Sequence, residues 1–280
     1  MLAIYSSLFN VAKMRFDWKG ALSNWLTFLN NEGQLSIVIN TSDDDSPTLV
    51  RKWLAAYQAE NPWCHTKITV TDASIPYDDP EFDGKLKALA LSHCTEPYCI
   101  LLDCDERIVP STRHLWVKLA IELQNDPRID AFLIPVVDLF GDEQHYRNPL
   151  NSKWYLHRNS PNITRGVVGF AYRANGSIDT SRSDTSEAIY LDTKGLVRAT
   201  PIVNPSFPHF LIAGILHGGE TAFVYHLGAL DQQQRIRQST FWAPVWANRN
   251  KSEQEAIPTL DDLSKVPRFK HDLPTWRTDQ

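Results

Sequence analysis

The segment Leu101-Leu102-Asp103-Cys104-Asp105-Glu106 decides the fold of this chain of 280 residues. The apolar residues 98–102 are expected to form a buried strand that ends at the first acidic residue. Side chains alternate along an extended strand, so Asp103 and Asp105 project to the same side if that conformation continues. Two carboxylates on one side can bind a hard divalent cation and its attached phosphates. The segment therefore predicts a metal site at a strand end, and an acidic end that only faces water is the alternative.

Short apolar runs alternate with helical patterns over residues 1–110. Asp17 is expected to cap the first helix, and Pro47 to lie in the first turn of the second. This succession predicts a largely parallel sheet with helices on both faces, and ligands of such sheets bind beyond the carboxyl ends of the strands. Strands are expected at residues 2–8, 35–40, 67–71 and 98–102, and helices at 18–29, 46–57 and 84–94.

Residues 111–250 are less regular. Pro135 lies within an expected strand and indicates an edge strand or a bulge. The apolar run at 210–216 is short enough to be a buried strand, and a helix is expected at 231–248. Residues beyond 251 are polar, contain three prolines and are expected to form an irregular, partly mobile extension. The other expected elements are a helix at 115–123 and strands at 131–137, 154–157, 167–172 and 223–225.

The composition excludes several classes of protein. Lys and Arg total 28 against 33 Asp and Glu, giving a net charge of −5, which argues against a nucleic-acid partner. We expect no transmembrane segment, because no apolar run approaches the length of about 18 residues that a membrane span needs. The N-terminus lacks the basic start of a secretory signal, and the four cysteines form no CxxC pair. We therefore expect a cytoplasmic protein, either free or peripheral to a membrane.

Two stretches resemble the core of the family 2 glycosyltransferases. They are Gly-Lys-Leu-Lys-Ala-Leu at 84–89 and Pro-Tyr-Cys-Ile-Leu-Leu-Asp-Cys-Asp-Glu at 97–106, and the resemblance resumes with Val-Tyr-His-Leu-Gly at 224–228. It implies a GT-A-like (Rossmann-like) α/β fold, with a central mixed, mostly parallel sheet flanked by helices and an irregular C-terminal acceptor part. Residues 1–110 would be the nucleotide-sugar-binding half, 111–250 the acceptor-binding half of the same domain, and 251–280 a polar C-terminal extension.

The same resemblance implies a donor site and a divalent cofactor, Mn²⁺ or Mg²⁺. Asp105 and His226 would bind this metal at the diphosphate, and Asp103 would face the ribose. A packed core histidine is the alternative for His226, and a solvated helix residue for Lys85. The remaining implied contacts are Ser6 and Asp43 with the base and Lys85 with the nucleotide.

The catalytic base has no clear signature in this sequence. An inverting transfer needs a carboxylate that takes the proton of the acceptor hydroxyl. Glu187 is our choice because a polar loop after a strand could form a lid over the acceptor, and Asp184 and Glu220 are the alternatives. Each is otherwise a surface carboxylate. Aromatic side chains could stack on sugar rings, with core packing as the alternative, and the candidates are Trp154, Tyr155 and Trp242.

These features together predict a metal-assisted, inverting glycosyltransferase. It would move a sugar from a UDP- or GDP-sugar to a hydroxyl of a glycan, lipid-linked or protein acceptor. One alternative is a nucleotidyltransferase, which normally carries a Gly-rich basic loop after its first strand. The residues Ser6-Ser7-Leu8-Phe9-Asn10 lack such a loop. The other alternative is a catalytically degenerate module that only binds nucleotide sugars.

Overall fold

The structure is a computed structural model. It describes residues 1–160 except 15, 77–78, 80–81 and 148–149, and then residues 207–230, 236, 240, 263 and 266–277. Between residues 161 and 206 it describes the backbone of short strands only.

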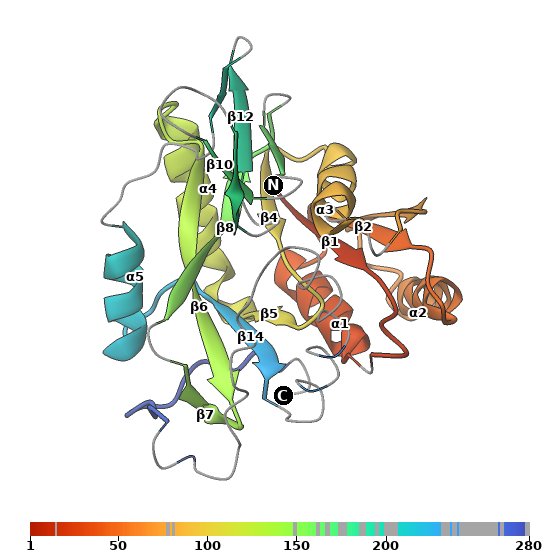
Figure 1. The fold of residues 1–280 in the computed structure, drawn as a ribbon. Helices are drawn as coiled ribbons and strands as arrows, with labels where there is room; N and C mark the ends of the chain where they lie inside the picture. Colours follow the sequence, from red (N-terminus) through yellow and green to blue (C-terminus); the bar gives the residue numbers. More distant parts are fainter. Residues whose placement is uncertain are drawn as a thin grey trace.

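Four parallel strands form the first half of the central sheet, in the order β3-β2-β1-β4 (Figure 1). Helices connect them in sequence, so the predicted alternation of strand and helix is confirmed. The strands are β1 (Leu2–Leu8), β2 (Gln34–Asn40), β3 (Lys67–Ala73) and β4 (Tyr98–Leu101), and the helices are α1 (Trp18–Leu29), α2 (Ser46–Glu60) and α3 (Phe82–Ser92).

Helices cover both faces of this half of the sheet. Ile4 of β1 packs in one core cluster with side chains of α1 and α2, whereas Tyr5 packs in a second cluster with side chains of α3. The predicted helix starts are also confirmed, because Asp17 Oδ1 accepts a hydrogen bond from Gly20 N over 3.0 Å and Pro47 lies in the first turn of α2. Because the four strands are parallel, their carboxyl ends share one edge of the sheet, where such sheets bind ligands.

The second half of the sheet is mixed, and its order continues from β4 through β8, β6 and β14 to β5. β8 runs antiparallel to both β4 and β6, whereas β14 runs parallel to β6 and antiparallel to β5. The expected GT-A-like α/β fold, a mixed sheet flanked by helices, is confirmed. These elements are β5 (Glu106–Ile108), η1 (Pro110–Thr112), α4 (Arg113–Asn125), β6 (Ala131–Phe140), β7 (Asp142–Tyr146), β8 (Asn151–Arg158) and β14 (Val224–Ala229).

Pro135 lies in β6, which has a partner strand on each side, so the prediction of an edge strand is wrong. The pairing of β6 with β8 shifts register between Phe132 and Ile134, directly before the proline. The predicted bulge is therefore the correct alternative, since a register shift accommodates a residue that cannot donate to the ladder.

Residues 210–216 are not a strand but lie in helix α5 (Phe207–Leu216). Leu211 and Ile215 are buried and four residues apart, so they lie on one helical face. Phe210 is 76% exposed on another face. A short run in which every residue is apolar fits the periodicity of a strand as well as that of a helix, which is why the sequence predicted the wrong element.

Residues 161–206 contribute two small sheets. One pairs β10 (Gly169–Tyr172) with β11 (Ile178–Asp184). The other joins β9 (Ile163–Arg165), β12 (Ile189–Thr193) and β13 (Leu196–Arg198). The helix predicted at 231–248 lies outside the described residues, apart from positions 236 and 240.

Residues 266–277 have the irregular backbone that the sequence predicted, and part of this segment packs against the sheet. Phe269 stacks on Tyr146 of β7 with ring centroids 4.1 Å apart, and Trp276 contacts Tyr225 of β14. Tyr225 also donates a hydrogen bond to the carbonyl oxygen of Pro274 over 2.9 Å. Burial of the aromatic side chains of Phe269 and Trp276 holds this segment on the sheet although many of its residues are polar. No helix in the described parts of the chain is both long and apolar enough to cross a membrane.

Candidate functional site

The acidic motif forms a turn at the carboxyl end of β4, not a continued strand. Glu106 N donates to the carbonyl oxygen of Asp103 over 2.8 Å, and Asp103 N donates to Glu106 Oε2 over 2.9 Å. The strand ends at Leu101, so the condition under which Asp103 and Asp105 share one side does not hold. The turn instead gives the two carboxylates different partners, one on α3 and one on β14.

Asp103 faces the helix that precedes its strand. Lys87 Nζ of α3 lies 3.0 Å from Asp103 Oδ1 and 2.9 Å from Asp83 Oδ2. Lys153 Nζ of β8 lies 3.9 Å from the other Asp103 oxygen. Burial raises the pKa of Asp103 to about 6, although the charges of Lys87 and Lys153 act in the opposite direction. Asp103 is thus a carboxylate whose charge depends on its two lysine neighbours.

Lys87 is the lysine of α3 that pairs with the motif, through Asp103, whereas Lys85 was predicted to contact the nucleotide. Lys85 Nζ binds Asp79 over 2.7 Å and keeps much of its side chain in solvent. Lys87 is buried, and it lies three and four residues before the buried Ala90 and Leu91. That helical spacing places Lys87 on the face of α3 that packs on the sheet, and it is the signal that sequence reasoning missed.

Glu106 is a structural member of the motif. Its buried carboxylate accepts hydrogen bonds from the Tyr155 hydroxyl and from Lys153 Nζ, the latter over 2.8 Å. Its carbonyl oxygen accepts from Trp25 Nε1 over 3.3 Å. Tyr155 is fully buried, so core packing, the alternative to sugar stacking, is the correct interpretation for this ring. These bonds anchor the acidic turn to β8 on one side and to α1 on the other.

Asp105 lies against His226, 121 residues away in sequence. His226 Nε2 is 3.3 Å from Asp105 Oδ2, and His226 Nδ1 is 2.9 Å from Asp138 Oδ1. The pairing of β14 with β5 and β6 creates this contact, because His226 is in register with Glu106 on one side and with Asp138 on the other. Leu227 N also donates to the carbonyl oxygen of Asp105 over 2.8 Å.

These charges shift each other's pKa values. Burial alone would lower the pKa of His226, but Asp105 and then Asp138 outweigh it and raise that pKa well above its usual value. Burial likewise favours a raised pKa for Asp138, but the hydrogen bond and charge of His226, with the charge of Arg147, lower it on balance. Without a metal, His226 is therefore an imidazolium that joins two carboxylates.

Asp105 and His226 fit two neighbouring positions around one divalent ion. Ligand atoms at about 2.1 Å from an ion and at right angles to each other lie about 3 Å apart, close to the 3.3 Å between Asp105 Oδ2 and His226 Nε2. Among the residues that the structure describes, no group of three or more His, Cys, Asp or Glu could hold a metal. The other ligands would be phosphate oxygens and water, which is usual for Mg²⁺, and His226 would have to release its proton.

The two predicted base contacts occupy different environments. Ser6 is fully buried on the face of β1 that also carries Ile4, so it has no exposed surface for a base. Asp43 is exposed, with Lys13 Nζ 3.5 Å away. A cavity of about 270 Å³ opens at the carboxyl ends of β2 and β3, and the residue before Asp43 lines it. Its lining includes Ser42, Arg51 and Asp72.

The candidates for the catalytic base do not gather at this site. Glu220 is 68% exposed and pairs with His114 of α4, 3.1 Å from its Nε2. Glu187 and the side chain of Asp184 lie outside the described residues, as do the side chains of Trp154 and Trp242.

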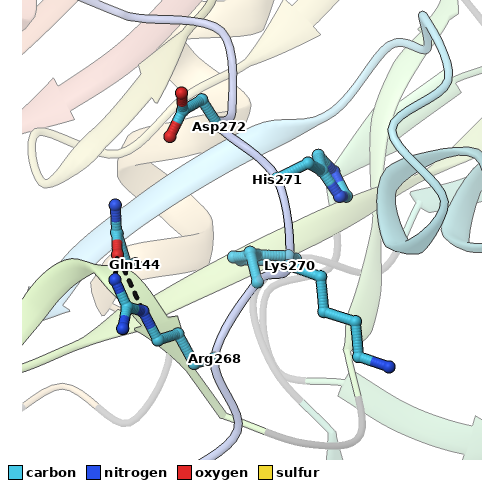
Figure 2. Close-up of a pocket in the computed structure, with 6 residues that line it drawn as sticks. Gln144, Arg268, Lys270, His271 and Asp272 are labelled. Atoms are coloured by element: carbon cyan, nitrogen blue, oxygen red, sulfur yellow. Dashed lines mark hydrogen bonds between the residues drawn. The ribbon is translucent and has the colours of Figure 1, made fainter.

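A larger cavity, of about 460 Å³, lies between β7 and the C-terminal segment (Figure 2). Gln144 and residues 268–272 line it, and none of the predicted site residues is among them. Arg268 Nε donates to Gln144 Oε1 over 2.7 Å at its wall. This cavity is separate from the acidic motif.

Comparisons with known proteins give weak structural similarities only. No family model and no curated protein matches this sequence. Staphylococcus aureus TarS, residues 1–349, is 12% identical over 59% of this chain and 50% of that chain, with a TM-score of 0.36. TarS 1–349 in complex with UDP-GlcNAc is 14% identical over 50% of this chain and 34% of that chain, with a TM-score of 0.29. A nucleoside-diphosphate-sugar pyrophosphorylase from Vibrio cholerae is 8% identical over 56% of this chain and 73% of that chain, with a TM-score of 0.30. At these values the similarity assigns neither a family nor an activity to this chain.

Proposed function

We propose that the chain is a glycosyltransferase that moves a sugar from a nucleotide-diphosphate sugar to an acceptor hydroxyl. The observation that carries this proposal is the contact between Asp105 and His226, 3.3 Å apart at the carboxyl end of β4. A carboxylate and an imidazole from distant segments meet there, at the edge where α/β sheets bind their ligands. This pair offers two of the ligands that a metal–diphosphate complex needs.

The donor would lie across the carboxyl ends of β1, β2 and β4. Asp43 and the cavity beside it would hold the base, and Asp103 would accept a hydrogen bond from the ribose. Asp105 and His226 would hold Mn²⁺ or Mg²⁺ against the diphosphate. When bound, this ion neutralises the charge that the diphosphate gains as the glycosidic bond breaks. Lys87 and Lys153 favour the ionised form of Asp103, which keeps it an acceptor at neutral pH.

The transfer would be a single, inverting displacement. It needs a carboxylate that removes the proton of the acceptor hydroxyl. Glu187 remains our candidate for this base, with Asp184 and Glu220 as alternatives. The acceptor would be a glycan, a lipid-linked sugar or a protein.

The alternative reaction, nucleotidyl transfer, is disfavoured by the loop after β1. Such enzymes need free N–H groups in this loop for a triphosphate. Here Asn10 N donates to Ser42 Oγ over 3.1 Å, Ala12 N to Ser46 Oγ over 3.2 Å, and Lys13 N to Asp44 Oδ2 over 2.7 Å. These N–H groups bond to side chains of the segment after β2, so they are not available to a phosphate chain.

Release of nucleoside diphosphate tests the proposal. Purified protein is incubated with Mn²⁺ or Mg²⁺ and with UDP- and GDP-sugars, without acceptor, and free UDP or GDP is measured. We expect slow release from at least one donor, lost in an Asp105→Asn variant. A donor at about 100 times its dissociation constant should also stabilise the protein by about 2.7 kcal/mol. Stabilisation without release would indicate a binding module, and pyrophosphate formed from a nucleoside triphosphate and a sugar phosphate would indicate the nucleotidyltransferase.

A further inference from the structure

Four polar side chains form a row across adjacent strands beside the acidic motif. The row runs from Arg147, just after β7, through Asp138 of β6 and His226 of β14 to Asp105, just before β5. Arg147 Nη1 lies 3.3 Å from Asp138 Oδ2, and the other Asp138 oxygen lies 2.9 Å from His226 Nδ1. His226 Nε2 then faces Asp105. Each link joins neighbouring segments, so the sheet itself sets the spacing of the row.

Asp138 lies on the side of the His226 ring opposite to Asp105, where it can fix the ring through Nδ1. An ionised carboxylate only accepts hydrogen bonds, so the nitrogen that faces Asp138 must carry the hydrogen. The opposite nitrogen, Nε2, is thereby directed at Asp105. The pairing of β6 with β14 holds Asp138 and His226 in register, and Arg147 holds the free oxygen of Asp138. Asp138, held by the strand pairing and by Arg147, therefore fixes the ring from its Nδ1 side.

This arrangement has the form that metal-binding histidines usually have. A ligating histidine generally donates its second ring N–H to a carboxylate or a carbonyl group, which fixes its tautomer and makes the other nitrogen a better ligand. Asp138 contacts the Nδ1 side of the His226 ring, whereas Asp105 contacts the Nε2 side. Asp138 would therefore act on metal binding through the orientation of His226.

We propose that Asp138 is a positioning residue that orients His226 Nε2 toward a divalent ion shared with Asp105. This inference rests on the proposed function, since it requires the ion that Asp105 and His226 would bind. It extends the site by one residue that the acidic motif does not contain. Removal of such a partner typically weakens metal binding about 10- to 100-fold.

Calorimetric titration of Mn²⁺ tests the proposal on the full-length chain, in the presence of saturating UDP and, separately, GDP. The variants are Asp138→Asn, Asp138→Ala, His226→Ala and the double variant Asp138→Asn/His226→Ala. Asp142→Asn is a matched control, because Asp142 also accepts a hydrogen bond from a histidine, His145 Nδ1, over 2.8 Å on the neighbouring strand β7. Thermal unfolding without Mn²⁺ reports the structural effect of each change.

We expect Asp138→Ala to weaken Mn²⁺ binding by about 10- to 100-fold and Asp138→Asn by less, because an amide oxygen still accepts from Nδ1. Asp142→Asn should bind Mn²⁺ as the wild type does. In the His226→Ala background, Asp138→Asn should have no further effect. A purely structural role would lower the thermal stability and leave Mn²⁺ affinity unchanged. Should Asp138→Ala fail to fold, Asp138→Asn carries the same comparison.

Three results would overturn the inference. The first is unchanged Mn²⁺ affinity in the Asp138 variants while His226→Ala binds more weakly, which would leave the proposed function intact. The second is an equal loss from Asp138→Asn with and without His226, which would show a general effect of charge. If the wild type binds no Mn²⁺ with either nucleotide, the metal-assisted mechanism fails and this inference fails with it.

Discussion

Replacement of Lys87 by methionine should destabilise the protein, because two carboxylates lose the cation with which they pair. The Lys87 side chain is 3% exposed, and its Nζ lies 3.0 Å from Asp103 and 2.9 Å from Asp83. Methionine keeps an unbranched apolar stem but removes the charge. Removal of one partner from a buried ion pair costs about 3–5 kcal/mol. The side chains of Asp83 and Asp103 are 24% and 27% exposed, so water replaces part of their interaction with Lys87. We therefore expect the free energy of unfolding to fall by about 3 kcal/mol.

Urea unfolding of a double-mutant cycle measures this coupling. The proteins are wild type, Lys87→Met, Asp103→Asn and the double variant, each at pH 7 and at about pH 5. Residues in one charged network usually show interaction energies of about 0.5–3 kcal/mol, and we expect at least about 1 kcal/mol here. The loss should be smaller at the lower pH. Asp103, whose pKa burial raises to about 6, takes up a proton there and no longer needs a cation.

The same cycle can refute the reasoning. If Lys87→Met costs the same free energy in the wild-type and Asp103→Asn backgrounds, Lys87 does not stabilise Asp103. If the cost does not change between the two pH values, the charge of Asp103 is not the reason for the loss. Either result would show that Lys87 stabilises the fold by packing and not by its charge on Asp103.

Asp105→Asn should abolish transfer and leave urea unfolding cooperative, because the Asp105 side chain faces His226 at the sheet edge and is not a core contact. Loss of cooperative unfolding in this variant would show that Asp105 is a structural residue. Asp43→Ala should raise the KM for the donor with little change in kcat, because an exposed group beside a cavity serves binding; an unchanged KM would count against a base contact. In the metal-free protein, the stability that His226 adds over His226→Ala should be greatest below about pH 6.5 and fall as the pH rises, since the folded-state pKa of His226 is raised. Urea unfolding of both proteins at several pH values below and above about 6.5 measures this difference. A stability difference that increased with pH would show that His226 does not form ion pairs with Asp105 and Asp138.

The first half of the fold was predictable because its signals are local. The apolar strands, the cap at Asp17 and the proline at position 47 each depend on neighbours within a few residues. The run at 210–216 shows the limit of this reasoning. A short, wholly apolar stretch has no polar face to define a period, so Leu211 and Ile215 reveal a helix only once the sheet that they contact is known.

The site was only partly predictable, for a different physical reason. The contact of Asp105 with His226 was inferred from a resemblance, but no local pattern specifies that β14 lies beside β5. Lys153 and Tyr155 were missed as partners of Glu106 because their contact depends on β8 pairing with β4 in antiparallel register. The direction of the Asp103 and Asp105 side chains also escaped prediction. One hydrogen bond, from Glu106 N to the Asp103 carbonyl oxygen, replaces the strand by a turn.

That turn places the motif at the junction between the parallel and the mixed halves of the sheet. Asp103 binds α3 in the first half through Lys87, whereas Asp105 binds β14 in the second half through His226. Glu106 fixes the junction, because its carboxylate is held by β8 and its carbonyl oxygen by Trp25 of α1. A ligand that spans Asp103 and Asp105 would therefore contact both halves at once. The first half holds Asp43 and Asp103 but not His226, so the complete site depends on the pairing of β14 with β5. Packing of Tyr225 of β14 against Trp276 ties that strand to the tail.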